Sequence, residues 1–251
     1  MVPVPLELLE LGMLVEPQSI VEKVWDQVLR IQQRLIWEPK TALILGSGPL
    51  GLLAAITCRI LNLDVYVWSM SPEGSIQAQL VRDCGAQYQQ SGSSESSQQN
   101  NLTLSAYAEK LGRPIDMILE CTGYSPLAFE AMSALAPNGV LALLGVTPSD
   151  KKVEIHSDAI NQSMVLENKC VIGSVNAARK DFETAIYRLM QMEEKHKGWL
   201  QRLITNRITL EQVPKLEFKD ISLKAVVDVI PQAQWRSLVK KTEEIAYSFS
   251  V

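Results

Sequence analysis

Three glycines within residues 41–56, TALILGSGPLGLLAAI, have the spacing of a turn that binds phosphate groups. Gly46, Gly48 and Gly51 form the pattern G-x-G-x-x-G between an apolar run typical of a buried strand and an apolar stretch typical of a helix. In such a turn the first glycine allows the tight bend, the second lets the backbone approach a pyrophosphate, and the third lets the helix pack on the strand. The helix start adds free N–H groups and a positive dipole end. The predicted pyrophosphate site comprises Gly46, Ser47, Gly48, Pro49, Leu50 and Gly51. The alternative is a strand-to-helix turn without a ligand.

The residues after the next predicted strand bear on which dinucleotide this turn would bind. An acid about 20 residues beyond the glycines usually holds a ribose 2′-hydroxyl. Asp64 has nearly this spacing, but it precedes the strand VYVWS and so lies at the wrong end of it. The carboxyl end carries Ser69 and Ser71, with neither an acid to repel a 2′-phosphate nor an arginine to bind one. This favours NADP slightly over NAD, and the alternative for both serines is an ordinary solvated turn.

Six apolar strands alternate with helices along the chain, which predicts an α/β fold. Almost wholly apolar strands are typical of a parallel sheet covered on both faces. We therefore expect a doubly wound parallel Rossmann sheet flanked by helices. Apolar residues at helical spacing follow Ser19, which we expect to be the N-cap of the first helix. Two later helices are expected at 126–135 and 178–194.

Composition excludes several classes of function. The 251 residues are 47% hydrophobic and carry a net charge of −4 without a basic run, which argues against binding nucleic acid. The N-terminus, with Glu7 and Glu10, does not resemble a signal peptide. The apolar stretch 42–60 is interrupted by glycines and contains Arg59, so it is a poor membrane span. We expect a cytoplasmic protein.

The cysteines and histidines are too dispersed to predict a metal site. No two cysteines form a C-x-x-C pair, so we expect buried thiols in a reducing compartment rather than disulfides or structural zinc. His156 and His196 lie in polar stretches and are expected to be solvated. Zinc catalysis needs about three protein ligands, so we expect no zinc on the isolated chain. The four cysteines are Cys58, Cys84, Cys121 and Cys170.

Five stretches together resemble the C-terminal part of glucose 1-dehydrogenases, members of the medium-chain, zinc-type dehydrogenase superfamily. They are the glycine turn and the segments LVEPQSIVEK (14–23), ECTG (120–123), LAPNGVLALLGV (135–146) and VLENKCVIGSVN (165–176). The resemblance runs from about residue 10 to 230. It implies hydride transfer between C1 of an aldose and NAD(P).

The resemblance also implies which residues would line the site. Thr122 and Gly123 match the end of the fourth strand, near the adenine-ribose and nicotinamide crevice. Asn176 and Glu16 match positions on the substrate side, where Glu16 could meet a metal only with a partner domain. Asn161 stands where relatives are expected to have a histidine, and Ser69 and Met70 stand where NADP enzymes of the family often have arginines. The residues matching the nicotinamide side are Gly145, Val146, Ser174, Val175 and Asn176.

Family members carry a GroES-like catalytic domain that supplies the zinc ligands, and we expect it to be absent here. The chain would then be the cofactor half of a dehydrogenase, inactive by itself. The alternatives are a free-standing dinucleotide sensor or pseudoenzyme, and a structural subunit with a vestigial glycine turn. The residues leave the identity of the sugar open.

The resemblance divides the chain into four parts and predicts an uncovered surface. The apolar residues of 2–17 and 199–230 would form a patch that needs a second copy, a separate catalytic subunit or the tail helix at 232–246 to cover it. Alternatively, both segments fold back onto the chain's own core. The four parts are a leading segment and helix (1–37), an NAD(P)-binding Rossmann domain (38–198), a segment returning to the absent domain (199–230) and a C-terminal helix or tail (231–251).

Overall fold

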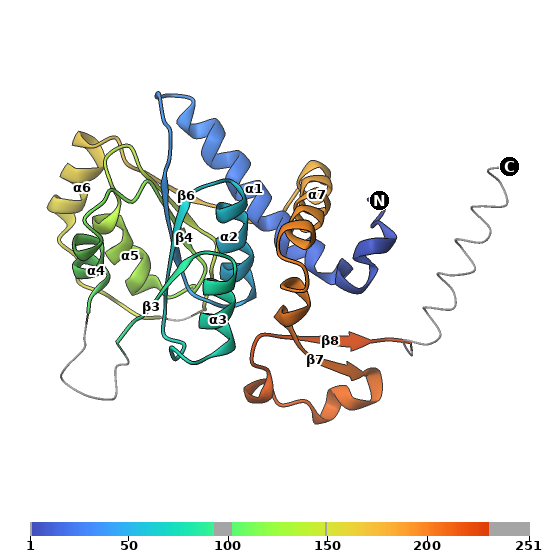
Figure 1. Cartoon of the computed structure of the whole chain (residues 1–251). Coiled ribbons are helices and arrows are strands. Elements are labelled where there is room, and N and C mark those ends of the chain that lie inside the picture. The colour runs from blue at the N-terminus through green and yellow to red at the C-terminus, as the bar shows by residue number, and fades with distance from the viewer. Residues whose placement is uncertain (1, 93–101, 149, 231–251) are drawn as a thin grey trace, which may run out of the picture.

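A six-stranded parallel sheet forms the centre of the computed structural model, which describes residues 2–92, 102–148 and 150–230 (Figure 1). The strand order is β3-β2-β1-β4-β5-β6. This order confirms the predicted doubly wound Rossmann sheet. The strands are β1 (Thr41–Leu45), β2 (Asp64–Ser69), β3 (Gln87–Gln90), β4 (Met117–Glu120), β5 (Val140–Leu143) and β6 (Cys170–Gly173).

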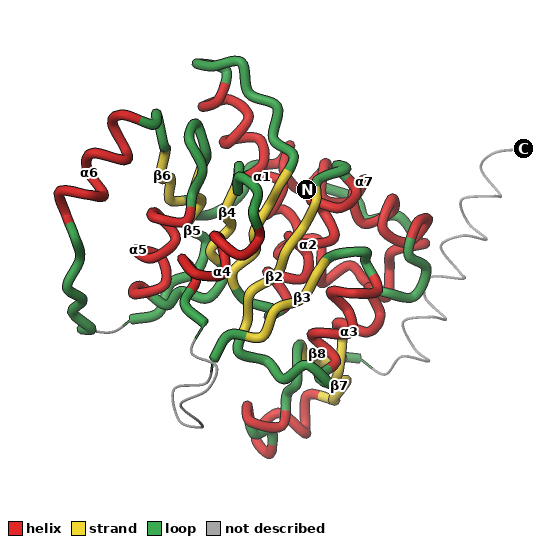
Figure 2. Tube along the Cα trace, turned by 60° about the vertical axis from the view of Figure 1, so that its left-hand side comes forward, coloured by secondary structure: helices red, strands yellow, loops and turns green. Residues whose placement is uncertain are grey.

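Helices cover both faces of this sheet (Figures 1 and 2). The helices α1, α2, α3 and α7 lie on one side, and α4, α5 and α6 on the other. Alternate residues of β1 serve the two layers, because Ala42 and Ile44 join one buried cluster while Leu43 and Leu45 join the other. The helices are α1 (Val15–Gln32), α2 (Pro49–Ile60), α3 (Ile76–Asp83), α4 (Leu104–Leu111), α5 (Ser125–Ala134), α6 (Ser157–Leu166) and α7 (Arg179–Lys195).

A buried ion pair joins α1 to α7. Glu22 and Arg188 are 4% and 8% exposed, and their Oε1 and Nε atoms are 2.9 Å apart. Gln18 donates to Glu22 at 2.8 Å and to Thr57 of α2 at 2.9 Å. Three of the four helices on this face, α1, α2 and α7, are therefore connected by one polar network inside an apolar layer.

The N-terminal segment folds back onto the chain's own core, so the predicted apolar patch over residues 2–17 is wrong. A 3-10 helix, η1 (Leu6–Leu14), buries Leu8, Leu11 and Leu14 in the same cluster as α1 and α7. The helix α1 continues directly from η1 and begins at Val15. Ser19 therefore lies inside α1, where its hydroxyl donates to the Glu16 carbonyl at 2.6 Å, and is not the N-cap.

The start of the second segment is buried in the same way. Trp199 and Leu200 are 3% and 0% exposed, and the Trp199 indole donates to the Leu80 carbonyl at 2.9 Å. Beyond them, β7 (Ile204–Thr209) and β8 (Lys224–Asp228) form a small parallel sheet (Figure 1). Leu210, Val229 and Ile230 are 53%, 73% and 40% exposed, so the part of this segment beyond its buried start retains some of the predicted apolar surface.

The short 3-10 helices of this region are η2 (Leu200–Leu203), η3 (Leu210–Lys215) and η4 (Phe218–Asp220). The tail helix expected at 232–246 lies outside the described residues. No helix within the described ranges is both long enough and apolar enough to span a membrane.

The burial of η1 predicts that its leucines stabilise the fold. Leu14→Ala removes a side chain that is 0% exposed and should lower the free energy of unfolding by about 2–5 kcal/mol. Leu6→Ala, at a position 46% exposed, is the matched control and should change it by about 0.5 kcal/mol or less. Denaturant unfolding of both variants is the measurement. Equal effects would contradict the packing of η1 in the core.

Candidate functional site

The glycine turn connects β1 to α2 with the predicted geometry. Gly46 has a positive φ of 99°, which only glycine adopts readily. Gly48 is the N-cap of α2 and Pro49 its first residue, and no side chain caps this helix start. A methyl group on Gly51 would lie 2.1 Å from the Gly46 carbonyl oxygen, whereas one on Gly48 would meet nothing within 4 Å. The turn is therefore tightly packed where Gly51 meets Gly46 and open at Gly48.

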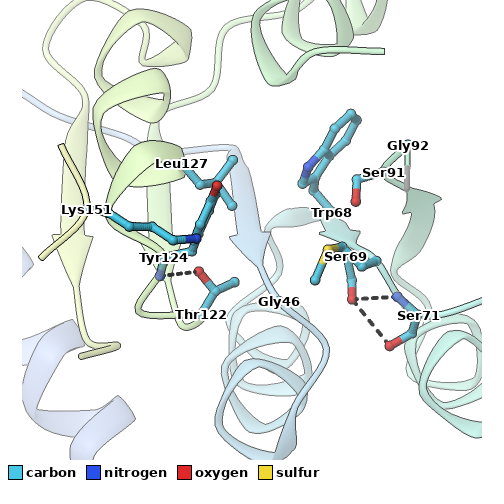
Figure 3. Close-up of a pocket in the computed structure, with 11 residues that line it drawn as sticks. Gly46, Trp68, Ser69, Ser71, Ser91, Gly92, Thr122, Tyr124, Leu127 and Lys151 are labelled. Carbon is cyan, nitrogen blue, oxygen red and sulfur yellow. Dashed lines mark hydrogen bonds between the residues drawn. The ribbon is translucent and has the colours of Figure 1, made fainter. Parts of the chain in front are cut away.

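A cleft of about 520 Å³ opens beside this turn, at the carboxyl ends of β1, β2 and β4 (Figure 3). The chain turns to β2 on one side of β1 and later returns to β4 on the other, and ligands bind in open α/β sheets at such a switch point. The residues lining the cleft are Gly46, Trp68, Ser69, Met70, Ser71, Ser91, Gly92, Thr122, Tyr124, Leu127 and Lys151.

Hydroxyl groups form the β2 side of the cleft. The Ser47 hydroxyl lies 2.7 Å from that of Ser69 and 3.1 Å from that of Ser71. Ser69 is only 9% exposed, so it is not part of a solvated turn. Asp64 is the first residue of β2 and pairs with Arg113 at 2.8 Å, which places its carboxylate at the opposite end of the strand, as predicted.

Larger side chains form the facing wall. The Lys151 ammonium lies 4.6 Å from the centroid of the Tyr124 ring, next to Leu127 (Figure 3). Trp68 lies on the opposite side of the cleft (Figure 3) and packs against Tyr107, with ring centroids 5.0 Å apart. The two walls together enclose a slot with apolar and cationic sides. The sequence reasoning missed Tyr124, although it directly follows Gly123, and nothing in the sequence separates Lys151 from other surface lysines.

The loops after β4 and β5 contact each other through glycine. A methyl group on Gly145 would lie 2.1 Å from the Gly123 nitrogen, and one on Gly46 would lie 2.9 Å from Thr122 Cγ2. The structure thus brings together Gly46, Thr122, Gly123 and Gly145, which the sequence places far apart. Val146, the next residue, is 90% exposed.

The loop after β6 lies against α1. The Ser174 hydroxyl lies 2.7 Å from the Gln27 side-chain oxygen, and Lys23 donates to the Val175 carbonyl. Val175 is 71% exposed, and Asn176 is exposed with a positive φ of 61°. Glu16 is exposed in the first turn of α1, about two helical turns before Lys23.

Comparison with known proteins identifies the family. The model described as "Glucose dehydrogenase C-terminus" matches residues 9–229. The chain belongs to this family. It is 36% identical to a glucose 1-dehydrogenase of Methanocella arvoryzae over 91% of its length, and 34% identical to glucose 1-dehydrogenase 2 of Vulcanisaeta moutnovskia over 92%. It spans about 62% of the length of each of these relatives.

A solved structure supports the same assignment. The glucose dehydrogenase of Haloferax mediterranei, in complex with NADP, Zn and gluconolactone, superimposes with a TM-score of 0.80 at 29% identity. The match covers 92% of this chain and 62% of the Haloferax protein. This confirms the resemblance to the C-terminal part of glucose 1-dehydrogenases.

The potential metal ligands of this family member are dispersed. His156 precedes α6 and His196 follows α7, at separate positions in the fold. Within the described part of the chain, no three His, Cys, Asp or Glu side chains lie close enough together to hold a metal ion. Burial raises the pKa of Cys58 to about 12 and that of Cys84 to about 11, so neither thiol is reactive near neutral pH.

The geometry of the turn predicts that adding a methyl group lowers the stability strongly at Gly51 and little at Gly48. Gly51→Ala places a methyl group against the Gly46 carbonyl and should lower the free energy of unfolding by about 3 kcal/mol or more. Gly48→Ala is the matched control, because its backbone angles suit any residue and its methyl group meets nothing. It should change the stability by about 1 kcal/mol or less. Thermal unfolding of both variants is the measurement, and a destabilised Gly48→Ala would contradict the open turn.

Proposed function

We propose that this chain binds NAD(P) in the cleft beside the glycine turn and forms the cofactor half of a glucose dehydrogenase-like oxidoreductase. The observation that carries the proposal is the open space above Gly48 at the uncapped start of α2. A pyrophosphate there would accept hydrogen bonds from free N–H groups of the first helical turn and interact with the positive end of the helix dipole.

The walls of the cleft suit the adenosine part of the dinucleotide. The slot between Trp68 and Met70 on one side and Tyr124 and Leu127 on the other accepts a flat ring, and the hydroxyls of the β2 side suit a ribose. The loops at Gly145 and at Ser174–Asn176 would then line the nicotinamide. Bound NADP or NAD would accept a hydride from C1 of an aldose, the substrate class that the family implies, with Glu16 and Asn176 on the substrate side.

NADP is proposed in slight preference to NAD. No carboxylate stands at the carboxyl end of β2, where Ser69 and Ser71 present hydroxyls that can donate to a phosphate as well as to a ribose. The nearest acid along the chain, Glu73, forms an ion pair with Arg82. A 2′-phosphate therefore meets no unpaired negative charge from these residues.

A zinc site like that of the Haloferax relative does not fit the residues described here. A tetrahedral site needs three or four converging ligands, and no three His, Cys, Asp or Glu side chains converge in the described part of the chain. We propose that the zinc ligands and most sugar contacts belong to protein outside these 251 residues, on the same polypeptide or on a separate catalytic subunit. The exposed Val146 and Val175 support a covering partner at this edge, for which a second copy of the chain is the alternative. The four free cysteines suit the reducing cytoplasm.

Dinucleotide binding by the 251-residue chain is the first test. Calorimetric titration should show binding of NADPH that is at least as tight as that of NADH. Gly48→Val places a branched side chain where the pyrophosphate would lie and should weaken binding at least about tenfold, or about 1.4 kcal/mol. Gly74→Val, at another glycine with nothing within 4 Å, controls for the added side chain. No binding of either dinucleotide at millimolar concentration would refute the cofactor site.

Turnover is the second test, because it separates a cofactor half from a complete enzyme. Without a zinc ion or equivalent group to stabilise the sugar alkoxide as hydride leaves, the isolated chain should bind the dinucleotide but not reduce it with any aldose of a panel. Elemental analysis after mild chelation should find no stoichiometric zinc. Steady turnover that Asn176→Ala or Glu16→Gln abolishes would contradict the proposal. If the chain also shows no turnover after the catalytic domain of a relative is added, the result would instead favour the alternative function, a dinucleotide sensor.

A further inference from the structure

Glu120, the last residue of β4, is a buried acid that the proposed function does not yet use. Its side chain belongs to a residue only 1% exposed. One carboxylate oxygen accepts hydrogen bonds from the Thr122 N–H at 2.6 Å, from the Gly123 N–H at 3.1 Å and from the Thr122 hydroxyl. The other oxygen lies 3.1 Å from the same Gly123 nitrogen. Burying a carboxylate is costly unless such donors replace water, so this arrangement needs an explanation.

The backbone of the same residue holds a second loop. The Glu120 carbonyl oxygen accepts the N–H groups of Leu144 at 2.9 Å and Gly145 at 3.0 Å. Side chain and main chain of one residue therefore bind the loops after β4 and β5 respectively. Both loops belong to the proposed dinucleotide site.

These two loops pack closely at Gly123 and Gly145, largely through main-chain atoms. A methyl group on Gly123 would lie 2.8 Å from the Thr147 hydroxyl oxygen, and one on Gly145 would lie 2.1 Å from the Gly123 nitrogen. On the other side, the Thr122 methyl group packs under Gly46 of the pyrophosphate turn. The Thr122 hydroxyl also accepts a hydrogen bond from the Tyr124 N–H at 2.9 Å, and the Tyr124 side chain forms part of the wall of the cleft (Figure 3).

We propose that Glu120 is a positioning residue for the dinucleotide. Its carboxylate holds the turn at Thr122 and Gly123, and this turn sets the spacing between the pyrophosphate turn, the Tyr124 wall and the loop at Gly145. The inference rests on the proposed function, because it names the residue that shapes that site. Glu120 itself is too buried to touch the ligand, so it acts through the backbone of the turn.

Glu120→Gln tests this role with little change in shape. The amide can replace only one carboxylate oxygen, and its NH₂ group then faces the Gly123 N–H, donor against donor. We expect NADPH to bind at least about tenfold more weakly, with less energy transfer from the chain's tryptophans to bound NADPH. Binding is measured on the full 251-residue chain, well below the melting temperature of each variant.

Asp116→Asn is the matched control for a purely structural role. The Asp116 carboxylate also accepts two backbone N–H groups, those of Lys40 at 2.8 Å and Thr41 at 2.9 Å, but at the amino-terminal end of β1. This variant should lose stability without losing affinity for NADPH. A positioning role for Glu120 requires the two variants to differ in affinity when their losses of stability are comparable.

The outcomes separate this inference from the proposed function. If the wild-type chain binds NADPH and Glu120→Gln binds it with the same affinity, the positioning role alone is overturned. The same holds if Glu120→Gln and Asp116→Asn lose affinity equally. A wild-type chain that binds neither NADPH nor NADH would overturn the proposed function and this inference with it.

If Glu120→Gln does not fold, the variant Thr122→Val is the test, because it removes the hydroxyl that Glu120 and Tyr124 share. Thr122→Ser keeps that hydroxyl and should bind NADPH more tightly than Thr122→Val. Equal binding of NADPH by wild type and Thr122→Val would overturn the inference.

Discussion

Direct backbone contact at glycine is the constraint on which the carboxyl edge of the sheet depends. The start of α2 rests on the Gly46 carbonyl through Gly51, and the β5 loop rests on the β4 loop where Gly145 meets Gly123. In neither place is there room for a Cβ atom. Spacing at these contacts is therefore set by van der Waals contact of main-chain atoms, which leaves little freedom for side-chain rearrangement. A cleft built on such contacts is largely formed before any ligand arrives.

This rigid edge requires a firm layer beneath it. The strand β1 is buried along its whole length and has hydrophobic clusters on both sides. The helices of one face are joined by the Glu22–Arg188 pair, an arrangement that is poor evidence of stability by itself but penalises any shift of one partner. The 3-10 helix η1 extends this layer, and the polar network and the apolar packing thus fix α2, whose first turn borders the cleft.

The buried strands and the glycine turn were predictable because local patterns determine them. Apolar runs bounded by turns identify buried strands, and the three glycines report the close contacts of a strand-to-helix turn. The packing of η1 was not predictable, since LELLELGML is equally apolar whether it meets its own core or another domain. The resemblance to larger enzymes therefore favoured the wrong surface for Leu8 and Leu11. Lys151 and Glu120 were missed for a related reason: their roles arise from contacts that no short motif encodes.

The two ends of the proposed site differ in how far this chain completes them. At the β2 side, Ser69 and Trp68 are 9% and 4% exposed and meet further walls from β4 and α5. At the β5 and β6 side, Val146 and Val175 are largely exposed, and neither lines the cleft. A dinucleotide would therefore find its adenosine end enclosed and its nicotinamide end open to solvent. Contacts at the enclosed adenosine end can supply binding energy even when the nicotinamide end lacks its second wall. Catalysis needs that wall as well, because it depends on contacts made in the transition state rather than on uniform binding. Under the proposed function, such a division would let this chain hold a dinucleotide while hydride transfer depends on the protein that supplies the second wall.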